Sequence, residues 1–317
     1  MPAEYTHQII AENVLEALPA AQRERVSDFS AYCIGAQGGD VFYFLRIFCT
    51  ARYNLGKFLH NCRVYDVFSE FLSAAAGAGP AGLSYIVGYI THYAADTVFH
   101  PFVYGMTAQL CAQYPRVRCR WHSYIESDLD TYFVEKSKGI PVGAYRFPVD
   151  RRTADAEQIA PVLDCVCRAV GQKRISPRLF RRALRRYEWF ERAFYDKHGR
   201  RRRFFTGMER LLHIPRFCST LCRRQQIDAR NINAGGAVWR NPSQPSLASA
   251  EGADALFDRS VRESVRLIGL FFACLDGGTQ LPREDFDKGF LSGVDCSLPV
   301  VRPHAGDGQM ADGPGPA

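Results

Sequence analysis

The hydrophobic residues of this chain recur mostly three and four positions apart, which is the spacing of an amphipathic helix. In residues 6–18, for example, Ile10 and Val14 fall on one face, and Pro19 ends the segment. Residues 177–195 carry apolar side chains on one face and arginines on the other. No convincing run of alternating residues predicts a strand, so we expect an all-α multi-helix bundle. The same spacing predicts helices over residues 22–33, 54–74, 117–135, 154–170, 204–222 and 250–275.

The most apolar part of the pattern contains three side chains that can bind a metal. Residues 81–100 are predicted to form a buried helix whose last turns carry His92, Asp96 and His100. Four residues slightly exceed one helical turn, so these side chains share a face, and each step overshoots by about 40°. The outer two diverge by about 80°, which favours Asp96 as a bridge between two metals. The competing interpretation is that a single histidine on an apolar helix is a hydrogen-bonded core residue.

Composition and length are those of a globular protein. Of the 317 residues, 47% are hydrophobic and 23% are charged, so the chain is long enough to bury a large core. We expect one helical domain over residues 1–300, with the ligand-bearing core at 5–135. Residues 301–317 are rich in Gly and Pro and are predicted to be a disordered tail.

No membrane span or secretory signal is predicted. The apolar stretch 86–104 contains His92, Asp96 and His100, which are costly in lipid. The first residues lack a charged region followed by an apolar core. Eleven cysteines without an export signal are expected to be reduced thiols, so we expect a cytoplasmic protein, peripheral to a membrane if it binds one.

Further candidate ligands lie on other predicted segments of the N-terminal half. They are His7, His60 and His122, together with the carboxylates Asp40 and Glu126. Histidine with carboxylate is a typical ligand set for catalytic zinc, although manganese and iron accept the same donors. Helices that project such residues inward are a known way to build a metal cluster in a bundle. We therefore predict a multi-metal site.

The segment Gly-Ala-Gln-Gly-Gly-Asp at residues 35–40 breaks the helical pattern. Asp40 suits the N-cap of the apolar run that follows, which is the ordinary interpretation. The glycines also allow the backbone to approach another group closely. A phosphate-binding P-loop is not indicated, because the segment has no Walker lysine and follows no strand.

The order of these ligands resembles that of the zinc-dependent phospholipase C family of bacteria, which shares its helical fold with the fungal single-strand-specific zinc nucleases. The Tyr-Thr-His of residues 5–7, the glycine-rich segment 35–40 and the Gly-Tyr-Ile-Thr-His of residues 88–92 are similar to the uncharacterised branch without a signal peptide. The resemblance covers residues 5–135, and ligand order across five segments makes it fairly specific.

The resemblance implies zinc as the cofactor, with two or three ions. Position by position, it implies a first ion on Asp40, His60, His92 and Asp96, a second on His100, His122 and Glu126, and a third on His7 and Asp96, with Asp96 as the bridge to the first. Secreted members complete the third position with the amino group and carbonyl of an N-terminal tryptophan. No tryptophan stands there in this chain, which leaves three expectations for the third position: that it is empty, that it is weakly held, or that water, Glu4 or a backbone group completes it.

The resemblance further implies a metal-dependent phosphoester hydrolase of the phospholipase C type. A zinc-bound hydroxide is expected to attack the phosphorus of a phospholipid or another phosphoester, with Asp40 as general base. Two other functions remain open on the sequence: a single-strand nuclease of the same fold, and a non-catalytic helical protein that metal stabilises and that binds a partner.

The net charge of +7 is concentrated in residues 173–210, which hold 14 basic and 4 acidic residues. An anionic membrane surface is one candidate partner of this segment, as an interfacial helix. A single-stranded nucleic acid is another, with Tyr187, Trp189 and Phe205 as candidate stacking residues. A solvated helix face without a partner is the third interpretation.

Overall fold

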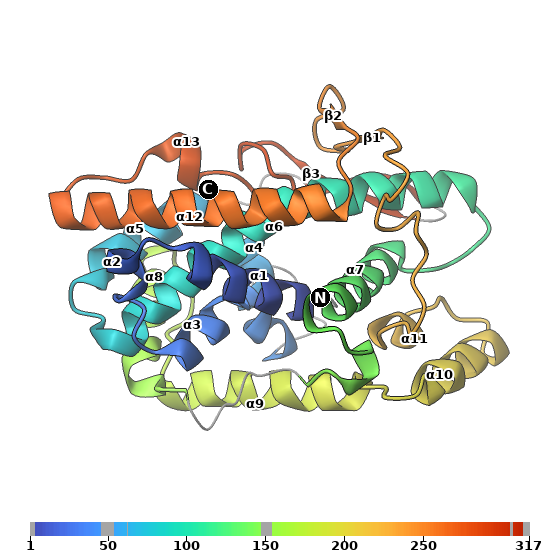
Figure 1. Cartoon of the computed structure of the whole chain (residues 1–317), viewed down its shortest axis with the longest axis horizontal. Coiled ribbons are helices and arrows are strands. Elements are labelled where there is room, and N and C mark those ends of the chain that lie inside the picture. The colour runs from blue at the N-terminus through green and yellow to red at the C-terminus, as the bar shows by residue number, and fades with distance from the viewer. Residues whose placement is uncertain (1–3, 46–53, 62, 147–153, 305–306, 313–317) are drawn as a thin grey trace.

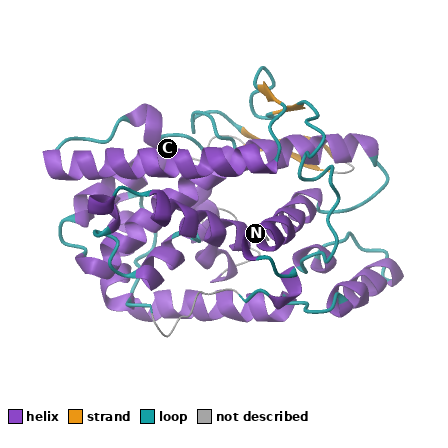
Figure 2. Ribbon diagram, viewed as in Figure 1, coloured by secondary structure: helices purple, strands orange, loops and turns teal. Residues whose placement is uncertain are grey.

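The computed structural model describes residues 4–45, 54–61, 63–146, 154–304 and 307–312. Helices make up most of these residues, and the few strands are short (Figure 2). The predicted all-α class is therefore confirmed. Figure 1 shows α12 (Ala253–Gly277) and α9 (Pro177–Phe194) along opposite long sides of the molecule, with the N-terminal helices between them.

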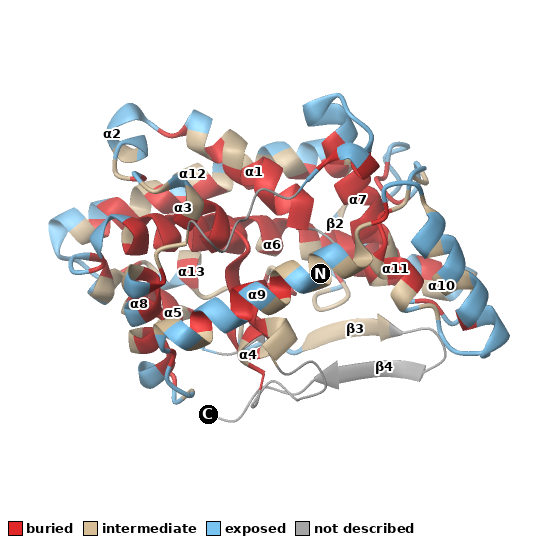
Figure 3. Cartoon of the chain, turned by 90° about the horizontal axis from the view of Figure 1, so that it is seen from below, coloured by how far each residue is buried: buried red, intermediate tan, exposed pale blue. Residues whose placement is uncertain are grey.

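Helix α6 (Gly79–Gln113) is the central element of the fold. It packs against α1 (Glu4–Ala17), α3 (Phe29–Gly35), α7 (Trp121–Lys138) and α12. Its side chains are apolar on nearly every face, so the helix is buried on nearly every face (Figure 3). The helix continues past residue 100, where the sequence predicted its end, and Pro101 lies inside it. At the other end, the side chain of Gln158 accepts a hydrogen bond from the Ala81 N–H at 3.0 Å.

Two glycines allow α3 to cross α6 with the backbones almost in contact. A Cβ added to Gly88 of α6 would lie 2.1 Å from the carbonyl oxygen of Tyr32. A Cβ added to Gly35 of α3 would lie 2.1 Å from the carbonyl oxygen of Tyr85. This crossing fixes where the segment that follows α3 meets the central helix.

Three predicted helices are each divided in two, and two of them lie in the N-terminal part of the chain. The segment 22–33 forms α2 (Ala20–Arg23) and α3, because the side chain of Asp28 caps α3 by accepting the Ala31 N–H at 2.9 Å. The segment 54–74 forms α4 (Leu55–Asn61) and α5 (Val64–Ala75), separated at Arg63, whose φ is 53°. The apolar spacing continues across both breaks, so it does not reveal them.

The remaining helices surround this core. The predicted helix 204–222 also forms two elements, α10 and α11, which pack together at one end of the molecule (Figure 1). Their bounds, with those of the other outer elements, are η1 (Gly38–Leu45), η2 (Val142–Ala144), α8 (Ala156–Ala169), α10 (Arg200–Leu211), α11 (Cys218–Leu221) and α13 (Arg283–Phe286).

The described strands form two antiparallel pairs. In the first, β1 (Trp239–Arg240) pairs with β2 (Ala248–Ser249). In the second, β3 (Val300–His304) pairs with β4 (Asp307–Asp312), where the sequence predicted a disordered tail. The β-branched Val300 and Val301 favour extended backbone, and the Val301 N–H donates to the Ser243 hydroxyl at 3.0 Å. Residues 313–317 of the predicted tail lie outside the described residues.

No helix within the described ranges is both long and apolar enough to cross a bilayer. The nine cysteines in these ranges are free thiols.

The α3–α6 crossing predicts the effect of one methyl group. Gly88→Ala should lower the free energy of unfolding by about 1–3 kcal/mol, because the new Cβ forces two backbones apart. Gly207→Ala in α10 is the control: nothing lies within 4 Å of its added Cβ, and loss of a helical glycine should stabilise by about 0.5–1 kcal/mol. Urea unfolding followed by circular dichroism measures both, and equal stability of Gly88→Ala and wild type would contradict the close crossing.

Candidate metal centre

Five elements bring all eight predicted ligands together in the interior. The ligands come from α1, η1, α4, α6 and α7, which are distant in sequence. Their nitrogen and oxygen atoms form three groups, within each of which the atoms lie no more than 4.8 Å apart: His7, His92 and Asp96; Asp40, His60 and His92; His100, His122 and Glu126. The predicted convergence in space is therefore present in the structure.

The group on α6, α4 and η1 has the spacing of zinc ligands. The Nε2 atoms of His60 and His92 lie 3.2 Å apart. Nε2 of His60 lies 3.3 Å from Oδ1 of Asp40, and Nε2 of His92 lies 3.4 Å from Oδ2 of Asp96. Zinc bonds of about 2.0–2.2 Å in a tetrahedron place ligand atoms about 3.3–3.6 Å apart. The residues present therefore fit a zinc ion.

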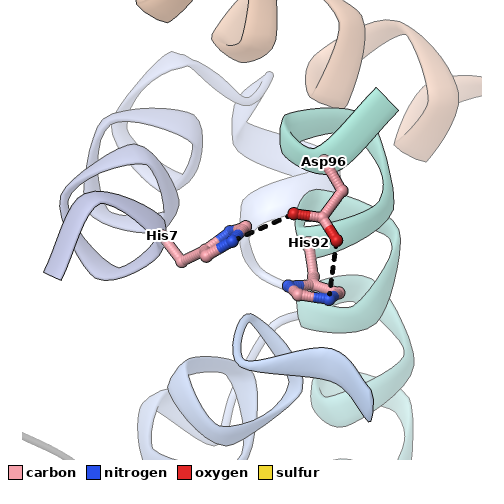
Figure 4. Close-up of side chains that lie close together, drawn as sticks. All are labelled: His7, His92 and Asp96. Atoms are coloured by element: carbon pink, nitrogen blue, oxygen red, sulfur yellow. Dashed lines mark ion pairs between the residues drawn. The ribbon is translucent and has the colours of Figure 1, made fainter. Parts of the chain in front are cut away.

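The carboxylate of Asp96 lies between two histidines from different helices (Figure 4). Its Oδ1 is 3.1 Å from Nε2 of His7 on α1, while its Oδ2 faces His92 on α6. Oδ1 is also 3.5 Å from Nδ1 of His100. One carboxylate thus presents its two oxygens to different groups, which is the arrangement expected of a bridging ligand.

The third group joins α6 to α7. Nε2 of His122 lies 2.9 Å from Oε1 of Glu126, and Nε2 of His100 lies 3.8 Å from the same oxygen. The two imidazole rings are stacked, with centroids 5.5 Å apart and planes 15° apart. Of the eight side chains, His122 is the most exposed, at 24%.

Backbone carbonyls orient two of the imidazoles. Nδ1 of His60 lies 2.6 Å from the Gly56 carbonyl oxygen, and Nδ1 of His100 lies 3.0 Å from that of Phe290. A proton on each Nδ1 leaves the Nε2 lone pair directed at the other ligands, as metal-binding histidines require. Sequence analysis missed both carbonyls, because any residue type supplies one.

The glycine-rich segment lies directly against the histidines. Gly38 has φ of +52°, and an added Cβ would lie 1.9 Å from the His92 ring. A Cβ on Gly39 would lie 2.8 Å from the His60 ring. The glycines therefore allow close approach of backbone to ligand side chains. Asp40 lies within η1 instead of capping an α-helix.

Burial and neighbouring charges shift the pKa values of these groups in opposite directions. Burial lowers the pKa of His92 well below its usual value, so its imidazole is neutral and keeps its lone pair at neutral pH. Burial opposes ionisation of Asp96, but the imidazoles of His92 and His100 outweigh it and hold its pKa below the usual range. Burial likewise opposes ionisation of Glu126, but the imidazole of His122 outweighs it and holds the pKa of Glu126 well below its usual value. The neutral imidazole of His92 beside these ionised carboxylates suits a cation.

Several polar atoms of the centre are buried without a hydrogen-bond partner among the described residues. They are Nδ1 of His7, His92 and His122, and Oδ2 of Asp96. Buried polar atoms are normally satisfied, so such a cluster requires an explanation. A metal ion accounts directly for Asp96, whose oxygen faces imidazole nitrogens instead of a proton donor.

A buried ionic network holds α1 beside this centre. The guanidinium of Arg223 donates to the carboxylates of Glu4, Asp130 and Glu191. Asp130 also accepts hydrogen bonds from the backbone N–H and the hydroxyl of Thr6, at 2.9 and 2.8 Å. His7 follows directly, so the network fixes the turn that carries it. The Glu4 carboxylate is already paired here, which leaves water or a backbone group as the expected substitute at the third metal position.

A family model described as zinc dependent phospholipase C matches residues 6–201. The match spans more than half of the chain, so the chain belongs to the zinc-dependent phospholipase C family. No curated protein and no solved structure matches the chain. Membership and the three ligand groups together support a metal-dependent phosphoester hydrolase. Arg223 and the Phe290 carbonyl lie beyond the matched residues.

The network around Arg223 predicts a large loss of stability on substitution. Arg223→Met should lower the free energy of unfolding by about 3–5 kcal/mol, because two buried carboxylates lose their counter-charge. Burial raises the pKa of both Glu4 and Asp130, and Arg223 opposes that rise. Without the guanidinium the carboxyls remain protonated in the folded state to higher pH, so stability is lost as pH rises through their folded pKa values.

Urea unfolding near pH 5 and pH 8 therefore tests the network, and the loss should be larger at pH 8. Arg230→Ala is the matched control, because Arg230 forms an exposed pair with Asp228 that is worth about 0–1 kcal/mol. A loss for Arg223→Met no greater than that of the control would contradict the role of the network.

Proposed function

We propose that this protein is a phospholipase C-like enzyme that uses zinc to hydrolyse a phosphodiester. The observation that carries the proposal is the set of lone-pair donors around Asp96: buried imidazole nitrogens and carboxylate oxygens face one another at zinc-ligand spacing. Membership of the zinc-dependent phospholipase C family supports the same reaction class.

Each ligand takes the role that its spacing supports. Asp40, His60, His92 and Asp96 would hold a first ion, since the distances between their ligand atoms that define the group run from 3.2 to 3.6 Å. His100, His122 and Glu126 hold a second ion. His7 and Asp96 would contribute to a third, where the chain supplies fewer ligands than at the other two and would leave room for water or substrate. An open position is what distinguishes a catalytic zinc site from a structural one.

Zinc bound in this centre supplies Lewis acidity and makes a coordinated water acidic enough to ionise near neutral pH. The chain contributes the proton acceptor and the orientation. Burial raises the pKa of the Asp40 carboxyl, which suits a general base better than a fully ionised surface carboxylate would. The carbonyls of Gly56 and Phe290 hold His60 and His100 in position throughout.

A phospholipid is the substrate class that the family description favours. Single-stranded nucleic acid is the alternative phosphodiester. The non-catalytic alternative is a protein that retains the metal but no longer turns over a substrate. All three are separated by one set of measurements.

The proposal predicts linked losses of metal and activity. The purified chain should contain two or three zinc ions and should cleave phosphatidylcholine and p-nitrophenylphosphorylcholine. His92→Ala and Asp96→Asn should lose at least one zinc equivalent and at least about 100-fold in kcat/KM, because each residue binds metal directly. Metal content by mass spectrometry and initial rates by product release check both. His198→Ala, an exposed histidine outside the centre, is the control and should match wild type.

Unchanged zinc content and activity in Asp96→Asn would reject the assignment. Cleavage of oligo-dT but not of phospholipid would establish the nuclease instead. Zinc at full occupancy without turnover on either substrate would establish a metal-stabilised binding protein.

A further inference from the structure

Residues 200–217, which we call the α10 tip, expose more large apolar side chains than any comparable part of the described chain. The tip comprises α10 and the loop that leads to α11 (Figure 1). Half of the twelve exposed large hydrophobic residues fall within it: Phe204, Met208, Leu211, Leu212, Ile214 and Phe217. Leu211 is 78% exposed and Phe204 is 62% exposed. Clustered exposed apolar side chains of this kind mark an interaction site.

The polarity of α10 is inverted relative to an ordinary surface helix. Phe204, Met208 and Leu211 are spaced by four and three residues, so they share one face, and that face is exposed (Figure 3). The opposite face carries Glu209, which is 4% exposed. The Glu209 carboxylate accepts the backbone N–H groups of Phe217 and Ser219 at 2.8 and 3.1 Å. The fold therefore holds this helix with its apolar face outward.

The charge of the tip is almost entirely positive. It contains six arginines and one acid, the buried Glu209. Arg200, Arg203 and Arg210 are exposed, and none of them forms a salt bridge with a residue in the described ranges. Exposed apolar side chains flanked by unpaired arginines are the composition of a helix that lies in a membrane interface.

We propose that the α10 tip docks on an anionic phospholipid bilayer, with Phe204, Met208 and Leu211 inserted among the acyl chains and the arginines at the head groups. Charge complementarity selects the anionic surface, because each arginine near such a surface adds to binding. This inference rests on the proposed function only in that a phospholipid substrate gives membrane docking a purpose. Adsorption to the bilayer does not require turnover.

Single-stranded nucleic acid fits the tip less well. Bases stack on exposed aromatic rings, whereas Leu211, Leu212 and Ile214 offer only aliphatic surface. Of the aromatic residues that the sequence suggested for stacking, Tyr187 is buried and donates its hydroxyl hydrogen bond to Gln37 at 3.0 Å. Phe205 is partly buried, and Trp189 alone is largely exposed, at 63%.

The tip is joined to the segment that begins α7, close to the most exposed metal-centre residue. The Arg120 N–H donates to the Arg216 carbonyl at 3.2 Å, and the Arg216 N–H donates to the Arg118 carbonyl at 3.0 Å. The guanidinium of Arg120 lies 4.6 Å from the centre of the Phe217 ring. His122 is two residues further along. A bilayer under the tip would therefore lie on the side of the centre that carries His122, its most exposed residue.

Vesicle sedimentation of the full chain tests the proposal. Wild type should bind phosphatidylcholine vesicles containing about 30% phosphatidylglycerol at least about tenfold more strongly than pure phosphatidylcholine, with the difference falling as salt rises. Leu211→Ser combined with Leu212→Ser should lower binding to anionic vesicles at least about tenfold. Arg200→Glu combined with Arg203→Glu should do the same. Separately, the tryptophan fluorescence of Leu211→Trp should shift to shorter wavelength on these vesicles.

Phe29→Ser combined with Val238→Ser is the matched control, because it removes two exposed apolar side chains, 50% and 61% exposed, outside the tip. It should bind vesicles like wild type. Equal binding by the tip variants and wild type would overturn the proposal. If wild type binds oligo-dT but not vesicles at the same salt, and the tip variants lose the oligo-dT binding, the tip would be assigned to nucleic acid. Dimers in sedimentation velocity that the leucine variant abolishes, without vesicle binding, would assign it to a second copy of the chain.

Hydrolysis measured in the same samples separates this proposal from the proposed function. Vesicle binding without hydrolysis would retain the membrane surface and reject the enzyme. Hydrolysis of a soluble substrate without vesicle binding would do the reverse.

Discussion

The fold depends on keeping one carboxylate, that of Asp96, ionised in the interior. Burial of an unpaired charge is costly, and the nitrogens nearest to this one belong to imidazoles on α1, α4 and α6, which would hold a cation together with it. Those contacts restrict the surrounding elements. Helix α6 must be central, η1 must approach through Gly38, and α1 must be held so that His7 reaches Oδ1. The apolar surface of α6 supplies the burial that makes each of these contacts strong.

The features that could be predicted from the sequence are those that the local geometry of a helix determines. The spacing of His92, Asp96 and His100 fixes their shared face as soon as the segment is helical, and the bridging position of Asp96 follows from the overshoot of each step. The breaks at Asp28 and Arg63 were missed because apolar residues continue at helical intervals on both sides of them. Arg223 binds Asp130, and the Phe290 carbonyl accepts from His100, across more than 90 positions of sequence, and no local pattern indicates a partner at that distance.

The helix α10 shows a different limit of sequence reasoning. Periodicity identifies two faces of a helix, but it does not state which one meets the protein. For α9 the apolar face is inward, as expected, with Tyr187 buried. For α10 the inward face includes polar residues: the Glu209 carboxylate accepts two backbone N–H groups of the following loop, and the Arg202 guanidinium donates to the Cys222 carbonyl. Those hydrogen bonds are made after the chain turns, so the helix sequence alone does not contain them.

The first turn of α1 explains how His7 is positioned by the chain's own side chains. The first N–H groups of a helix have no intrahelical acceptor. Here Asp130 of α7 accepts the Thr6 N–H, and Arg223 binds both Asp130 and Glu4. The position of His7 is therefore set through α7, the helix that also carries His122 and Glu126. A single buried guanidinium thus couples the position of His7 to that of His122 and Glu126, so a movement of α7 would displace all three side chains.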